Sequence, residues 1–198
     1  MRHIDQQTEF FVALIMFFYC TMEIGFASWL PTYAIKAGLT DTEGSGFYSL
    51  LFWFPNAVGR LVWTFVPGSV HFKLGVILRV QLCSVGLMVV LQWLELYSAV
   101  CYCGGIISGF TLANMYSLCL AVSNSHGFHL TITNNSHIVL ANCLGEGLLI
   151  APIGYSMNLV SFHSLIYLVA LFSVAAYLAF SQAERCFQQL KAKEEPTH

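Results

Sequence analysis

Two carboxylic acids stand inside long apolar stretches of this sequence. Glu23 is the only charged residue between Phe10 and Ile35, and Glu146 lies in a second apolar run. A charged side chain at the centre of a bilayer costs about 2.5–3.5 kcal/mol on insertion scales, so both acids should face a bundle interior or a water-filled cavity. A carboxylate in such a place can bind a polar solute, couple its movement to H⁺ or Na⁺, or join two helices.

Other polar and aromatic residues accompany the two acids at helical spacing. Tyr19 precedes Glu23 by four positions, Trp29 lies near the same stripe, and Asn142 precedes Glu146 by four. Aromatic faces stack on sugar rings, and amide and carboxylate groups bind hydroxyls, as a site for a sugar or similar polyol requires. The candidate substrate-binding residues are Glu23, Trp29, Tyr19, Asn114 and Asn142.

Two roles remain open for each acid. Each acid is either an ion-coupling or gating group, with Glu23 also a substrate ligand, or a structural strut between helices that pairs with Arg60 or Arg79. Arg60 itself, close to a loop, is expected to be a structural, loop-anchoring charge.

Composition places the chain in a membrane. It has 198 residues, of which 57% are hydrophobic and 9% are charged, whereas soluble domains carry about 25% charged residues. The net charge of −2 gives no basic face for nucleic acid. No nucleophile, Walker or metal-ligand motif is present, and His126 and His129 are interpreted as part of a polar loop. We therefore expect no enzyme activity, cofactor or metal.

Hydropathy predicts six membrane-spanning helices, since a span needs about 20 apolar residues. The predicted spans are 10–33, 46–66, 74–93, 97–122, 136–157 and 160–180. The expected domains are a cytoplasmic segment 1–9, a transmembrane domain 10–181 and a cytoplasmic tail 182–198. Of the eight Lys and Arg residues only Lys36 falls on the side opposite the termini, so both termini should be cytoplasmic. A plasma membrane and an organelle membrane both fit.

Three motifs resemble one transporter family. The stretch "FFYCTMEIGFASWLPTYAI" resembles the opening helix of the C-terminal half of fucose-permease-like members of the major facilitator superfamily, which include sodium-dependent glucose transporter relatives. Tyr19, Glu23, Gly25 and Trp29 carry this likeness, and the sequence departs from it at Thr21 and Ala27, where the pattern tends to have Gly. The other matches are "FYSLLFWFPNAVGRL" and "LGEGLLIAPIGY", the second with a displaced Pro152.

The resemblance implies an all-α fold, the six-helix half of a major facilitator bundle, in which Glu23 contacts substrate or couples an ion. The expected partners are the bilayer, a small polar solute with H⁺ or Na⁺, and a second six-helix half. That half could be missing from this chain, a second copy or another protein. The alternative is a non-transporting structural subunit that reuses the fold.

Overall fold

The computed structural model describes residues 2–125 and 132–194. Within these residues the chain is helical and has no strand. Its helices are α1 (Arg2–Lys36), α2 (Gly46–Phe65), α3 (Val70–Trp93), α4 (Tyr97–Leu112), α5 (Met115–Ser125), α6 (Ile132–Leu159) and α7 (Ser164–Glu194). The predicted loop residues His126 and His129 and the last four residues of the tail lie outside the described residues.

The helices begin and end close to the predicted spans, with longer outer ends. Helix α1 begins at Arg2 instead of near Phe10, and α7 runs continuously from Ser164 to Glu194, through most of the expected tail. Gly38 ends α1 with a left-handed backbone, φ +72°, and Leu39 N–H donates to the Ala34 carbonyl at 3.0 Å. This is a Schellman cap, for which glycine is the favoured residue.

The fourth predicted span is interrupted. Helix α4 ends at Leu112 and α5 begins at Met115. At the end of α4 the Trp63 indole donates to the Phe110 carbonyl at 3.1 Å, and the Thr111 hydroxyl donates to the Ile107 carbonyl at 2.8 Å. Side chains that bond helix carbonyls in this way bend a helix or interrupt its hydrogen-bond ladder. Hydropathy alone predicts a continuous helix because all these residues lie in one apolar run.

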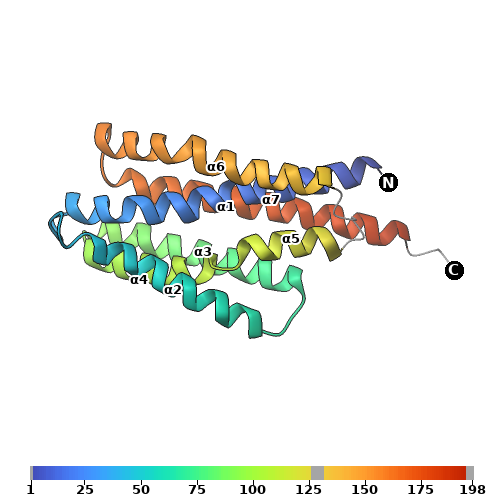
Figure 1. Ribbon diagram of the computed structural model, residues 1–198, viewed down its shortest axis with the longest axis horizontal. Helices are drawn as coiled ribbons and strands as arrows, with labels where there is room; N and C mark the ends of the chain where they lie inside the picture. The colour runs from blue at the N-terminus through green and yellow to red at the C-terminus, as the bar shows by residue number, and fades with distance from the viewer. Residues whose placement is uncertain (1, 126–131, 195–198) are drawn as a thin grey trace.

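The helices form one elongated bundle with both termini at the same end (Figure 1). Helix α1 packs mainly against α6 and α7, whereas α4 packs mainly against α2 and α3, and α3 also packs against α7. If α4 and α5 are counted as one span, the chain divides into two units of three consecutive spans. The first helix of each unit then packs against the second and third helices of the other unit.

Glycines allow close backbone contacts between the two units. A Cβ atom on Gly145 of α6 would clash with the Phe17 carbonyl of α1, and one on Gly109 of α4 would clash with the Phe52 carbonyl of α2. Small residues permit this close backbone approach between membrane helices, where packing replaces the hydrophobic effect as the source of association.

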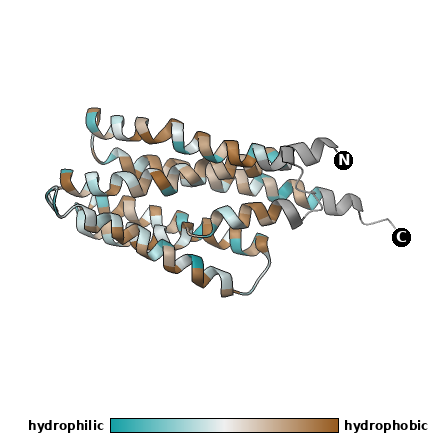
Figure 2. Ribbon diagram, in the orientation of Figure 1, coloured by the Kyte–Doolittle hydropathy of each residue, from teal (hydrophilic) through white to brown (hydrophobic). Residues whose placement is uncertain are grey.

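Five segments of the described chain are long and apolar enough to cross a membrane: Glu9–Lys36, Val70–Trp93, Tyr97–Val122, Ser136–Leu159 and Ser164–Gln189. Helix α2 coincides with the remaining predicted span, is not among these five segments, and carries Asn56 and Arg60. Hydrophobic residues occur along the whole length of the bundle, with hydrophilic ones interspersed (Figure 2).

Candidate solute-binding cavity

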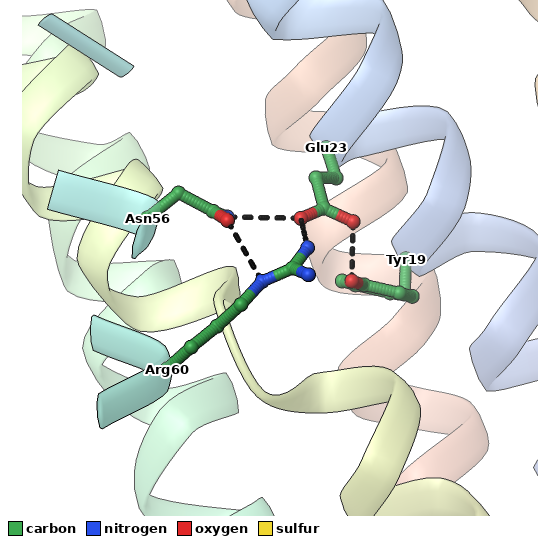
Figure 3. Close-up of polar contacts among 4 residues, drawn as sticks. All are labelled: Tyr19, Glu23, Asn56 and Arg60. Atoms are coloured by element: carbon green, nitrogen blue, oxygen red, sulfur yellow. Dashed lines mark hydrogen bonds and ion pairs between the residues drawn. The ribbon is translucent and has the colours of Figure 1, made fainter. Parts of the chain in front are cut away.

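Glu23 lies at the contact between α1 and α2 and is only 6% exposed. The Tyr19 hydroxyl, one helical turn earlier, donates a hydrogen bond to Glu23 Oε2. Asn56 Nδ2 from α2 donates to Glu23 Oε1 at 2.9 Å (Figure 3). Both carboxylate oxygens therefore have a donor, which is what a buried acid needs to offset its lost hydration.

Arg60 completes this polar group. Its Nε donates to Asn56 Oδ1 at 3.1 Å, and a terminal nitrogen lies 3.8 Å from Glu23 Oε1. The Arg60 side chain is 60% exposed, whereas that of Glu23 is 7% exposed. The guanidinium thus reaches from an open position toward a buried acid, and the structure places Arg60 beside Glu23, as the strut interpretation expects.

A cavity of about 440 Å³ opens next to this group. Four parts of the chain line it: α1, α2, the α4–α5 junction with the start of α5, and α6. Its polar and charged lining residues are Tyr19, Glu23, Arg60, Thr64, Asn114, Tyr116, Ser117, Asn142 and Glu146. This volume falls within the range of small-molecule sites, about 300–1,000 Å³.

Sequence reasoning named six of these lining residues. Glu23, Tyr19, Asn114, Asn142, Glu146 and Arg60 come together in the cavity, although they are spread over four segments. Asn114 lies in the interruption between α4 and α5, and its carbonyl accepts the first hydrogen bond of α5 from Leu118 N–H at 3.1 Å. Interrupted membrane helices place backbone groups beside a binding site, where an unbroken helix would conceal them.

Trp29 lies elsewhere. Its indole Nε1 donates to the Ile150 carbonyl of α6 at 2.9 Å, and its ring occupies the space that a Cβ on Gly154 would need. Trp29 is not among the residues that line the cavity. In this structure it joins α1 to α6.

Glu146 differs from Glu23 in its surroundings. It is exposed on α6 and lines the cavity, and no hydrogen bond or ion pair joins it to another described residue. An unpaired acid inside an apolar span requires water or an opposing polar surface. The cavity therefore has one unpaired acid and, on α2, one exposed guanidinium.

Asn56 belongs to the polar group around Glu23 but was not among the predicted site residues. It precedes Arg60 by four positions, which indicates a shared helix face, but its main partner is Glu23 on another helix. Thr64, Tyr116 and Ser117 also line the cavity. No group of three or more His, Cys, Asp or Glu side chains suited to a metal ion occurs in the part of the chain that the structure describes.

Comparisons with protein-family models, curated proteins and solved structures found no match to this chain. Its class rests on its helices: five apolar segments of membrane-spanning length define an integral, multi-pass membrane protein. No particular family is assigned by these comparisons.

Proposed function

We propose that this chain is one half of a secondary transporter that moves a small polar solute, a hexose or a related sugar, by alternating access. The observation that carries the proposal is the cavity, in which polar groups from four segments converge inside the apolar bundle. Hydroxyls, amides and carboxylates in one place match the hydrogen-bonding groups of a sugar. The sequence motifs around Glu23 and Arg60 favour the major facilitator superfamily.

The packing order supports the same proposal. Two three-span units in which α1 packs on α6 and α7, and α4 on α2 and α3, are the pattern expected of an inverted internal repeat. In transporters built from such repeats the solute lies near the midplane and the rigid parts move around it. In this proposal α2 also crosses the membrane, which brings the number of spans to six, and both termini are cytoplasmic.

The exposed charges support an opposing half. Arg60 is 60% exposed and Glu146 is exposed, and both lie inside apolar helices that a lone bundle would present to lipid. A second six-helix half over the cavity would enclose both groups and the solute between two walls.

Glu23 and Arg60 give this site a means of coupling. A cation or proton at Glu23 would compete with the Arg60 guanidinium. The ion pair between them joins one guanidinium nitrogen to Glu23 Oε1 at 3.8 Å. Binding there would release Arg60 toward the cavity, where it could contact a solute hydroxyl. Ion binding and solute binding would then act on one group of side chains.

The paired state of Glu23 favours a second candidate function. Because both of its oxygens already accept hydrogen bonds, Glu23 can serve as a strut between α1 and α2 in a non-transporting subunit of a membrane complex. In that case the cavity would be part of a protein interface.

Binding of sugars to the purified full chain separates the two candidates. Tryptophan fluorescence would be titrated with a panel of hexoses and polyols, with and without Na⁺ and at two pH values. Saturable binding of one solute that Asn142→Ala weakens would support the transporter. No binding by a chain that native mass spectrometry finds as one copy in a large unrelated complex would support the subunit.

A further inference from the structure

A second polar groove lies at the end of the bundle where both termini are found. It has a volume of about 690 Å³ and lies between the beginning of α1 and the end of α7. The residues that line it are Gln7, Phe10 and Phe11 from α1, and Gln182, Arg185, Cys186 and Gln189 from α7. None of them lines the central cavity, so the groove is independent of the proposed transport site.

The lining combines three kinds of group. Gln7, Gln182 and Gln189 supply amide donors and acceptors, Arg185 supplies a guanidinium, and Phe10 and Phe11 supply apolar surface. The only formal charge among these lining residues is positive. A planar guanidinium flanked by amide donors suits the oxygens of a phosphate group.

No described carboxylate neutralises Arg185. No ion pair joins Arg185 to another described residue, and the carboxylate of Glu9 on α1 lies 3.1 Å from the imidazole of His137 on α6. Arg185 is exposed. Its guanidinium is therefore exposed and has no ionic partner among the side chains that the structure describes.

The groove lies where the apolar part of the helices ends. In the sequence the apolar run of α1 begins at Phe10 and that of α7 ends at Phe180, and the stretches outside these two residues are mainly polar. Gln7, Arg185 and Gln189 therefore lie outside these apolar runs, whereas Phe10, which is 63% exposed, lies at the start of one. If the hydrocarbon layer covers these apolar runs, the polar end of the groove lies at the headgroup layer and the phenyl rings lie at the start of the acyl chains.

We propose that this groove binds an anionic phospholipid, with Arg185 and the glutamine amides on the headgroup phosphate and Phe10 and Phe11 against the upper acyl chains. The apolar component distinguishes a lipid from a free phosphate ion, which would make no use of two phenyl rings. The net positive lining selects an anionic headgroup over a zwitterionic one.

Native mass spectrometry of the full chain tests this proposal. The detergent-purified protein would be titrated with phosphatidylglycerol and with phosphatidylcholine of the same acyl chains, each with and without inorganic phosphate. We expect tighter retention of phosphatidylglycerol, and Arg185→Gln should weaken that retention roughly tenfold, as loss of a charge-assisted hydrogen bond implies. Arg79→Gln, which removes an exposed cation of α3 outside both cavities, is the matched control.

Three results would overturn the proposal. Equal retention of the two lipids would show that the groove does not select an anionic headgroup. An equal loss of phosphatidylglycerol retention in Arg79→Gln and Arg185→Gln would show that retention depends on the net charge of the protein and not on this groove. Displacement of the lipid by inorganic phosphate would identify a site for soluble phosphate instead. If Arg185→Gln does not fold, Gln189→Leu removes one headgroup donor at an exposed position and should also lower retention of phosphatidylglycerol.

Discussion

Asn56 joins Glu23 to Arg60. Its amide nitrogen lies 2.9 Å from Glu23 Oε1 and its amide oxygen 3.1 Å from Arg60 Nε, so one buried side chain serves an acid and a base on two different helices. Asparagine fits this position because its amide carries both a donor and an acceptor. Through these two hydrogen bonds Asn56 fixes the position of the Glu23 carboxylate relative to the Arg60 guanidinium.

Replacement of Asn56 should therefore destabilise the bundle. Asn56→Leu leaves Glu23 Oε1 without its amide donor and Arg60 Nε without its acceptor, at a cost of about 1–3 kcal/mol. The measurement is the thermal unfolding midpoint in detergent. Asn114→Ala is the matched control, since Asn114 is half-buried and makes no side-chain hydrogen bond with another described residue. Equal midpoints for the two variants would contradict the bridging role.

Glu23→Gln separates a binding role from a strut role. If Glu23 binds solute or a coupling cation, the variant should lose roughly tenfold or more in affinity, because a charged acceptor becomes neutral. Its unfolding midpoint should change little, since Gln keeps one acceptor and its neutral side chain is less costly to bury. Solute titration and thermal unfolding of the same sample give both values. Unchanged affinity with a lowered midpoint would identify a strut.

A pair of glycine substitutions tests the contact between α1 and α6. Gly145→Ala places a methyl group against the Phe17 carbonyl and should cost about 1–3 kcal/mol of stability. Gly147→Ala, two residues away, meets no atom within 4 Å and should be neutral or stabilising by up to about 1 kcal/mol. Unfolding midpoints of the two variants would be compared. If Gly145→Ala were as stable as Gly147→Ala, the result would contradict a close backbone contact between α1 and α6 at Gly145.

Trp29→Phe tests whether this residue belongs to the cavity. The phenyl ring keeps apolar packing on Gly154 but cannot donate to the Ile150 carbonyl, so stability should fall by about 0.5–1.5 kcal/mol with solute affinity unchanged. Trp53→Phe is the control, because Trp53 is 39% exposed and its indole makes no hydrogen bond with a described residue. A loss of solute affinity in Trp29→Phe without a loss of stability would indicate that Trp29 contacts the solute, as the sequence predicts.

The spans and the polar set of the cavity followed from the sequence because both depend on local properties. Apolar run length locates a span, and the cost of a buried carboxylate predicts that Glu23 avoids lipid. The spacing of Asn142 and Glu146 likewise predicts one shared helix face, and both line the cavity.

Other features depend on contacts between distant segments. Trp29 follows Glu23 by six residues, which rotates it about 240° around the helix and moves it about 9 Å along the axis, toward α6. The interruption before Met115 coincides with hydrogen bonds from Trp63 and Thr111, which hydropathy does not register. Glu23 and Asn56 are 33 residues apart, and only helix packing pairs them.

The two sets of partners of α1 also differ in when they become available during synthesis. Asn56 follows its partner Glu23 by 33 residues. Gly145 follows its partner Thr21 by 124 residues. Because chains are made from the N-terminus onward, α1 and α2 can enter the bilayer as a hairpin in which the acid already has its amide donor. The α1 face that contacts α6 acquires its partner only after 124 further residues have been made. The Glu23–Asn56 pair thus gives the nascent protein an early means of keeping a charged helix in the membrane.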